Sequence, residues 1–284
     1  GMVSDVSNDD IVRLMVGREL QNRFNAMKEN VSNLAHDTVF EVRNVTSRDR
    51  KKVRDISFSV CRGEILGFAG LVGSGRTELM NCLFGVDKRA GGEIRLNGKD
   101  ISPRSPLDAV KKGMAYITES RRDNGFFPNF SIAQNIAISR SLKDGGYKGA
   151  MGLFHEVDEQ RTAEAQRELL ALKCHSVNQN ITELSGGNQQ KVLISKWLCC
   201  HPEVIIFDEP TRGIDVGAKA EIYKVMRQLA DDGKVILMVS SELPEIITVC
   251  DRIAVFCEGR LTQILTNRDD MSEEEIMAWA LPHE

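Results

Sequence analysis

Residues 184–191 read Leu-Ser-Gly-Gly-Asn-Gln-Gln-Lys, and residues 204–210 read Val-Ile-Ile-Phe-Asp-Glu-Pro. The second stretch is an apolar strand that runs directly into two carboxylates, Asp208 and Glu209. The first places small residues before a helix expected over 188–198, and a helix N-terminus presents N–H donors and partial positive charge to an anion. Together the two stretches predict an α/β chain that clamps a nucleotide between two protein surfaces.

A glycine-rich loop lies upstream, after a strand expected over 65–69 and at the start of a helix expected over 77–83. It reads Gly70-Leu-Val-Gly73-Ser74-Gly75-Arg76-Thr77. Glycines let backbone N–H groups converge on phosphate oxygens. Arginine replaces the lysine of the G-x-x-x-x-G-K-[ST] pattern; it keeps the charge but is bulkier and planar. We expect the phosphates of ATP to be bound by Gly70, Gly73, Ser74, Gly75 and Arg76, with the Thr77 hydroxyl on Mg²⁺.

The paired carboxylates suit two roles at such a site. Asp208 ends a buried strand and is expected to hold Mg²⁺ together with Thr77, and Glu209 is expected to polarise the attacking water as a general base. The plain alternative is a pair of solvated, idle acids. The apolar strand that leads directly into them argues against this alternative.

Ser185, Gly186, Gly187 and the turn residue Asp215 are expected to contact a nucleotide held by another domain. The first three precede a helix, and Asp215 ends a Thr-Arg-Gly-Ile-Asp turn positioned to reach across an interface. The plain alternatives are an ordinary serine-capped helix for the first group and, for Asp215, the N-cap of a helix over 216–229. For Asp215 the two roles are compatible.

Strand and helix patterns alternate from Thr38 onward, which predicts an α/β fold. Short apolar runs predict central strands of a mainly parallel sheet, buried on both faces, at 65–69, 115–118, 204–208 and 235–239. Alternating runs at 38–45 and 55–60 predict an antiparallel β piece. We also expect a charged helix over 158–172, a hairpin turn at 258–259 and a last helix over 272–281.

The composition argues against several classes of protein. A formal net charge of −4 and a pI near 5.9 provide no basic field, so no nucleic-acid partner is expected. The 7 cysteines are odd in number and lack metal-ligand spacing, which indicates reduced cytosolic thiols. No apolar run approaches the ~20 residues of a membrane helix. Any membrane role therefore requires a partner.

The two ends of the chain resemble each other. Residues 7–15 read Ser-Asn-Asp-Asp-Ile-Val-Arg-Leu-Met and residues 272–280 read Ser-Glu-Glu-Glu-Ile-Met-Ala-Trp-Ala, and both have the pattern of a capping box. Either these are two unrelated surface helices, or residues 1–33 are the tail of an upstream copy and a linker, followed by a nucleotide-binding domain over 34–284. Both interpretations stay open.

The order of the motifs resembles that of the ABC transporter ATPases over about residues 38–281. Gly-Leu-Val-Gly-Ser-Gly-Arg-Thr-Glu-Leu and Asp-Glu-Pro-Thr-Arg-Gly-Ile-Asp-Val-Gly-Ala-Lys look like the second, C-terminal nucleotide-binding half of bacterial monosaccharide-importer ATPases. That group serves ribose, galactose, arabinose, xylose and allose, and the D-allose type looks most similar. The resemblance implies a P-loop NTPase fold with an antiparallel β subdomain and a helical subdomain over about 119–190.

The resemblance also implies partners. In this family two such domains share one polypeptide, ATP closes them face to face, and closure reshapes a membrane permease that receives sugar from a periplasmic binding protein. The chain would then lie at the cytoplasmic face of the bacterial inner membrane, held there by the permease. Phe126 and Phe127 stand where the family contacts its permease, and they are either a docking patch or part of the subdomain core.

The chain departs from the family around the nucleotide. Glu119 replaces a glutamine that contacts Mg²⁺ and water, and Ser241 replaces a γ-phosphate-sensing histidine. The stretch 184–191 resembles the family's signature motif, in which Asn188 replaces a glutamine. Arg50 stands nearest to the position of an aromatic that stacks on adenine, where an arginine can stack through a cation–π-like contact. Three of the changes, at Arg76, Glu119 and Ser241, fall in one nucleotide site and predict that the chain binds ATP·Mg²⁺ but hydrolyses it weakly. Its residues 185–187 would then complete the competent site of the upstream half.

An ABC-type ATPase of DNA repair or translation is the alternative from a different class. Those proteins usually carry coiled-coil arms or basic linkers, and the interval between Thr77 and Leu184 has neither sustained heptads nor a basic run. A nucleotide sensor that never hydrolyses is a further alternative, against which the retained Glu209 argues. A small-molecule kinase has no use for the motif at 184–191.

Overall fold

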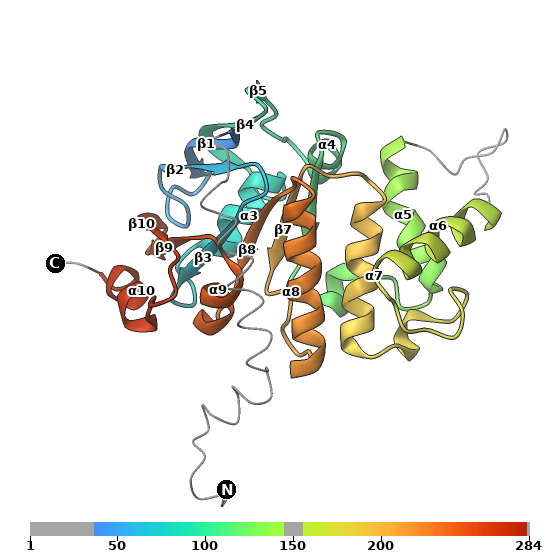
Figure 1. Cartoon of the computed structure of the whole chain (residues 1–284). Helices are drawn as coiled ribbons and strands as arrows, with labels where there is room; N and C mark the ends of the chain where they lie inside the picture. The colour runs from blue at the N-terminus through green and yellow to red at the C-terminus, as the bar shows by residue number, and fades with distance from the viewer. Residues whose placement is uncertain (1–36, 145–155, 283–284) are drawn as a thin grey trace, which may run out of the picture.

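The computed structural model describes residues 37–144 and 156–282. In these residues two β-sheets with flanking helices form one part of the molecule, and further helices extend from its side (Figure 1). The strands are β1 Thr38–Ser47, β2 Ile56–Cys61, β3 Ile65–Gly70, β4 Arg89–Leu96, β5 Lys99–Asp100, β6 Met114–Ile117, β7 Val204–Asp208, β8 Val235–Val239, β9 Arg252–Cys257 and β10 Arg260–Thr266. The helices are α3 Arg76–Phe84, α4 Pro106–Lys111, η3 Arg121–Gly125, α5 Ile132–Asp144, α6 Glu156–Leu169, η4 Ile181–Glu183, α7 Gly186–Leu198, α8 Val216–Asp231, α9 Leu243–Val249 and α10 Glu273–Ala280. The segment 1–33, expected to be an upstream tail and linker, lies outside the described residues.

The larger sheet has six strands in the order β10-β9-β3-β8-β7-β6. Its strands are parallel except β10, which pairs antiparallel with β9, so the expected mainly parallel core sheet is confirmed. Strands β7 and β8 coincide with the expected ranges 204–208 and 235–239. The expected hairpin turn joins β9 to β10, where Glu258 and Gly259 have φ angles of 47° and 78°.

Both faces of the central strands are buried, which explains their continuous apolar sequences. Side chains alternate between the two faces of a strand. Along β7, Val204 and Ile206 join the core shared with the smaller sheet, whereas Ile205 and Phe207 join the core beneath α8 and α9. The strand can therefore accept a charged residue only where it ends, and Asp208 stands there.

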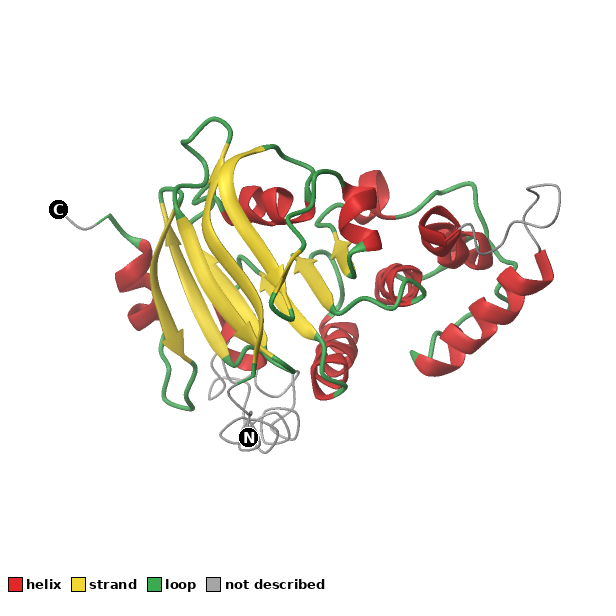
Figure 2. Cartoon of the chain, turned by 90° about the horizontal axis from the view of Figure 1, so that it is seen from above, coloured by secondary structure: helices red, strands yellow, loops and turns green. Residues whose placement is uncertain are grey.

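The smaller sheet is antiparallel, in the order β2-β1-β4-β5, and confirms the expected antiparallel β piece. Figure 2 shows the strands in yellow with helices beside them. The smaller sheet packs on the larger sheet through Phe58 of β2, whose ring centroid lies 5.4 Å from that of Phe68 in β3. Within the larger sheet, the Phe68 ring centroid lies 5.9 Å from that of Phe256 in β9. The sequence pattern did not predict β4, because Gly91-Gly92 in its first half weakens a strand pattern.

Helices α5, α6 and α7 and segment η3 build the helical part of the molecule around a core of their own (Figure 1). Helix α6 corresponds to the charged helix expected over 158–172, whereas α5 was not expected. Phe126 is 7% exposed and belongs to this core, so it cannot be a docking residue, while Phe127 is 47% exposed. Within the ranges that the structure describes, no helix combines the length and the hydropathy needed to cross a bilayer.

Candidate nucleotide-binding site

The glycine-rich loop over 70–77, called the phosphate loop below, connects β3 to α3 through backbone conformations that favour glycine. Gly75 caps α3 with a φ of 106°, and a Cβ atom there would come within 2.3 Å of the Lys52 carbonyl oxygen. Gly70 has a φ of 150°, and a Cβ atom there would lie 2.5 Å from the Phe256 carbonyl oxygen. Side chains are thus excluded on both conformational and steric grounds. The loop ends at a helix N-terminus, which favours an anion.

A pocket of about 440 Å³ lies over this loop. It brings together the phosphate loop and the segments that follow β6, β7 and β8. Its lining residues are Val72, Gly73, Ser74, Gly75, Arg76, Thr77, Glu78, Glu119, Glu209, Arg212, Ser241 and Glu242. The buried Oγ of Ser74 has no hydrogen-bond partner among the residues that the structure describes, and a bound anion would satisfy such an atom.

Asp208 adjoins this pocket and offers oxygen ligands for a cation. Thr77 Oγ1 donates a hydrogen bond to Asp208 Oδ1 at 3.2 Å, and the Tyr116 hydroxyl donates to Oδ2 at 2.8 Å. Burial raises the pKa of the Asp208 carboxyl, and these hydrogen bonds oppose the rise. Hydroxyl and carboxylate oxygens suit Mg²⁺. The residues expected to hold the metal are therefore side by side and chemically suitable.

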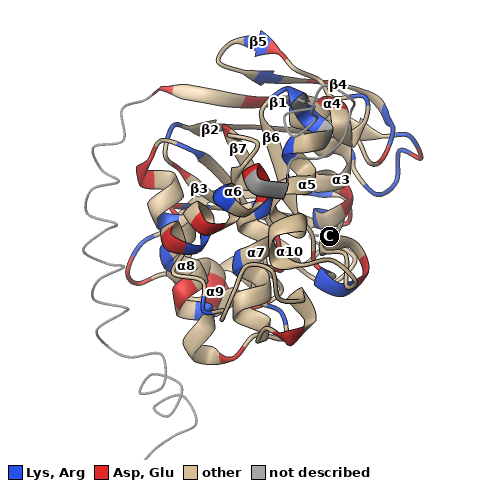
Figure 3. Cartoon of the chain, turned by 90° about the vertical axis from the view of Figure 1, so that its right-hand side faces the viewer, with Lys and Arg blue, Asp and Glu red and all other residues tan. Residues whose placement is uncertain are grey.

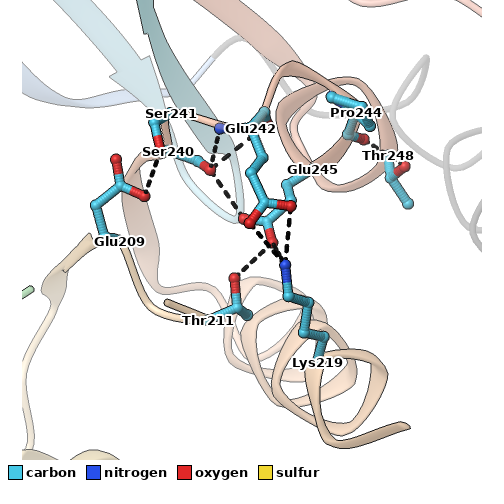
Figure 4. Close-up of polar contacts among 9 residues, drawn as sticks. All are labelled: Glu209, Thr211, Lys219, Ser240, Ser241, Glu242, Pro244, Glu245 and Thr248. Carbon is cyan, nitrogen blue, oxygen red and sulfur yellow. Dashed lines mark hydrogen bonds and ion pairs between the residues drawn. The ribbon is translucent and has the colours of Figure 1, made fainter. Parts of the chain in front are cut away.

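Glu209 follows β7 with a left-handed backbone, at a φ of 49°. Such strain in a non-glycine residue is typical of functional sites. The Ser241 hydroxyl donates to Glu209 Oε2 at 3.2 Å (Figure 4). Burial raises the pKa of Glu209, while Ser241 and the positive charge of Arg76 oppose the rise. A carboxyl group with a raised pKa is suited to accept a proton from water.

Arg76 is buried at the base of the pocket and contacts the chain's own backbone. Its exposed fraction is 7%, and Nη1 donates to the carbonyl oxygen of Ser240 at 2.5 Å. Burial lowers the pKa of the guanidinium, and the nearby carboxylates of Glu209 and Asp208 oppose this. The residue that replaces the phosphate-binding lysine is thus already engaged by the segment after β8.

Glu119 lies in the pocket but does not act as a lone negative charge. It forms an ion pair with Arg212, which follows Glu209 by three residues. The negative charge that Glu119 brings in place of a neutral glutamine is therefore offset by a neighbouring cation. Sequence reasoning missed Arg212, although it directly follows the Asp-Glu-Pro-Thr stretch, and it missed Tyr116, the polar aromatic of an otherwise apolar strand.

The signature residues lie outside this pocket's lining, at the N-terminus of α7. Ser185 is the N-cap residue, yet its side chain makes no capping hydrogen bond. Instead Asn188 Nδ2 donates to Ser185 Oγ at 2.9 Å, while Asn188 Oδ1 accepts from the Lys173 backbone N–H at 2.9 Å. The serine hydroxyl therefore does not accept a hydrogen bond from a backbone N–H of the first helical turn, and the plain alternative of an ordinary serine cap is wrong.

Asp215 stands near the signature and caps α8, accepting a hydrogen bond from the Ala218 N–H at 3.0 Å. Arg121 links the two elements: its Nη2 donates to the Gly213 carbonyl at 3.2 Å, and a Cβ atom on Gly186 would lie 3.4 Å from the same nitrogen. Arg121 and Gly213 are 92 residues apart in sequence, so no local pattern indicated this contact.

Arg50, expected to contact the base of the nucleotide, lies apart from the pocket lining described above. It is exposed in the turn between β1 and β2, with a φ of 54°. The same turn does approach the site, because Lys52 forms an ion pair with Glu78 at 3.3 Å.

Comparison with known proteins agrees with this geometry. The family model described as ABC transporter matches residues 53–212. The D-allose import ATP-binding protein AlsA of Escherichia coli strain K12 is 98% identical over 284 residues, which is 100% of this chain and 56% of that protein. A ribose import ATP-binding protein, RbsA of Bacillus cereus, is 43% identical over 280 residues, 98% of this chain and 54% of that protein. The chain thus spans about half the length of the curated relatives it matches.

Solved structures share the fold. An ATP-binding cassette of an ABC transporter, MJ1267, has a TM-score of 0.72 at 21% identity, over 86% of this chain and 99% of that one. A nucleotide-free ATP-binding cassette has a TM-score of 0.72 at 20% identity, over 85% and 95% of the two chains. Because the family model covers more than half of the sequence and the fold agrees, the chain belongs to the ABC transporter family.

Proposed function

We propose that this chain is the C-terminal, ATP-binding half of a tandem ATPase that powers the import of a monosaccharide. One observation carries the proposal: Ser185, Gly186 and Asp215 lie outside the lining of the chain's own phosphate pocket. Their position suits contact with a nucleotide held by another domain. The upstream half of the same polypeptide supplies that domain, since the relatives are about twice as long as this chain.

The ligand of the pocket is ATP with Mg²⁺, as is general for ATPases of this family. Gly70, Gly73, Ser74 and Gly75 would surround its phosphates, and Thr77 and Asp208 would hold the metal. When bound, Mg²⁺ neutralises phosphate charge. Arg50, exposed in the turn between β1 and β2, would contact the base.

Hydrolysis at this pocket is weak for reasons that reside in the chain itself. Arg76 is held by the Ser240 carbonyl at 2.5 Å, which keeps its guanidinium engaged with the protein. Ser241 is bonded to Glu209 and is too short to act as the missing histidine. Glu119 is paired with Arg212. Glu209 remains able to accept a proton, so slow turnover persists. The chain's main contribution is its signature helix, which completes the upstream active site.

The chain couples to a membrane permease through the helical part. Phe127 is exposed and stacks on Phe130, with ring centroids 5.1 Å apart. Phe130 also lines a hollow of about 310 Å³ together with residues of α5 and α6. An exposed aromatic pair beside a hollow suits the insertion of a partner helix. The permease would hold the chain at the cytoplasmic face of the inner membrane and receive sugar from a periplasmic binding protein.

A role in DNA repair or translation is not favoured. The relatives reported above are named as sugar import proteins. Acidic and basic residues are interspersed along the chain in Figure 3.

Nucleotide binding by the chain alone tests the proposal. Calorimetric titration should show Mg²⁺-dependent ATP binding, with turnover far below that of the full-length relatives. T77A and D208N should each weaken Mg²⁺-dependent binding by about tenfold or more. T182A, which alters an exposed threonine of the helical part, is the matched control. Failure of the wild-type chain to bind ATP·Mg²⁺ would refute the assignment of the pocket.

A further inference from the structure

Glu245, in α9, is a buried carboxylate that gathers hydrogen bonds from separate elements. It is 6% exposed. Its Oε1 accepts from Thr211 Oγ1 at 2.6 Å and from Lys219 Nζ at 2.8 Å, and its Oε2 accepts from Ser240 Oγ at 2.8 Å. Figure 4 shows these donors converging on Glu245 from the loop after β7, from α8 and from the loop after β8. Glu245 itself does not line the nucleotide pocket.

Two of these donors belong to loops that carry site residues. Ser240 precedes Ser241, which bonds Glu209, and its own carbonyl accepts from Arg76. The loop after β8 is thus held by Arg76 at the backbone and by Glu245 at the side chain.

On the other side, Thr211 follows Glu209 by two residues and precedes Asp215 by four. Lys219 lies in the first turns of α8, the helix that Asp215 caps. The same carboxylate therefore holds both the pocket side and the loop that ends at Asp215.

Glu245 and its hydrogen-bond donors form a buried network that includes charged groups. Burial alone would raise the pKa of Glu245, but hydrogen bonds from Lys219, Thr211, Tyr223 and Ser240 together lower it. Lys219 is shared with Glu242, at 2.8 Å to either carboxylate oxygen. Removing one member of a buried, charged network leaves the others unsatisfied, so the network holds its loops in one arrangement.

We propose that Glu245 is a positioning residue that ties the loop after β8 to the loop after β7, so that the chain's own nucleotide pocket and the Asp215 surface move as one unit. This inference rests on the proposed function, in which Asp215 faces a nucleotide on the upstream half. Glu245 transmits the state of one nucleotide site to the other without contacting either nucleotide.

A buried ion pair elsewhere in the fold provides a matched control. Asp251 is 5% exposed, accepts from Arg227 Nη1 at 2.9 Å and from the Ile65 backbone N–H at 2.7 Å. Ile65 begins β3, whereas the phosphate loop follows the end of that strand. D251N therefore disturbs a carboxylate of similar burial at the opposite end of the sheet.

The test compares E245Q with D251N through separate readouts. The dissociation constant for ATP·Mg²⁺ is measured on this chain, and ATP turnover is measured on full-length AlsA carrying the equivalent changes. E245Q should alter both by about fivefold or more. S240A should mainly weaken ATP binding, and T211V should mainly slow turnover. D251N should lower the melting temperature and leave both readouts within about twofold.

The positioning role is refuted if E245Q lowers the melting temperature as D251N does while neither readout moves, or if only one readout moves. Wild-type chain that fails to bind ATP·Mg²⁺, or full-length protein whose turnover is indifferent to D215A, would instead refute the proposed function. The two failures are therefore distinguishable.

Discussion

Arg76 Nη1 donates a hydrogen bond to the carbonyl oxygen of Ser240 at 2.5 Å, across 164 residues of sequence. The contact joins the phosphate loop to the end of β8, on the floor of the nucleotide pocket. It places the one cation of the loop against the protein backbone. This hydrogen bond explains how a phosphate loop with the backbone conformations expected of its glycines can belong to a site that we propose to be weakly hydrolytic.

R76K should increase the affinity of the chain for ATP·Mg²⁺ by about fivefold to tenfold, because a compact ammonium group can reach the phosphates. Without nucleotide, losing the Ser240 hydrogen bond should lower stability by about 1 kcal/mol. Calorimetric titration and thermal unfolding measure the two effects. R76M is the control, since it loses the same hydrogen bond without supplying a cation. Equal affinities of R76K and R76M would contradict this explanation.

Gly186 and Gly187 should respond differently to alanine. A Cβ atom on Gly187 would lie 2.5 Å from the Cβ of Ala218 in α8, so G187A should destabilise the chain by about 1–3 kcal/mol. A Cβ on Gly186 meets nothing closer than 3.4 Å. G186A should therefore leave the unfolding free energy nearly unchanged. Urea unfolding of both variants decides this, and equal losses of stability would show that the signature tip is packed otherwise.

Substitutions at Phe126 and at Phe127 should also have different effects. F126D places a charge in the helical core and should cost about 3 kcal/mol or more. F127D alters an exposed ring, so the chain should keep its melting temperature while the full-length protein loses most of its sugar transport. Transport assays in vesicles, with ATP turnover measured in parallel, test this. Normal transport by F127D would contradict the proposal that Phe127 contacts the permease.

Lys196 gives the chain a pH-dependent stability. It is buried, and its ammonium donates to the Gly125 carbonyl oxygen. Burial lowers the pKa of Lys196 from 10.5 to about 8. Below pH 8 both folded and unfolded states bind the proton. Between that pH and the unfolded pKa only the unfolded state does, so this contribution makes stability rise with pH.

The free energy of unfolding should rise by up to about 3 kcal/mol, as calculated from the difference between the folded and unfolded pKa values of Lys196. Buried thiols such as Cys199 have raised pKa values and act in the opposite direction. The difference between wild type and K196M removes their effect. Urea unfolding at pH 7.5 and pH 10 should show this difference growing in favour of the wild type, and parallel pH profiles would contradict the pKa of Lys196.

The parts of the fold that sequence reasoning predicted are those where local pattern and burial agree. The strand Val204–Asp208 was predicted to the residue because its apolar residues are buried on both faces and the charged residues begin where the strand ends. Helix α5 was missed because Ile132–Asp144 mixes apolar and polar residues without a clear stripe. In the exposed first half of β4, consecutive glycines conceal the strand.

The same distinction applies to the site. The phosphate loop and the Asp208–Glu209 pair are each a contiguous stretch of sequence, so each could be predicted from a strand and the turn after it. The partners of Arg76 and Glu119 come from other strand ends, and only the order of strands in the sheet brings them close. Glu245 lies in a short helix whose sequence gives no sign that four donors converge there.

The central claim is that residues 185–187, at the N-terminus of α7, contact a nucleotide held by the upstream half. The direct test is ATP turnover by the separately produced upstream half, alone and mixed with this chain. Wild-type chain should raise turnover by about tenfold or more, whereas G186A chain, with unchanged stability, should not. If the G186A chain restored turnover as fully as the wild type, or if this chain alone turned over ATP as fast as the mixture, the claim would be contradicted.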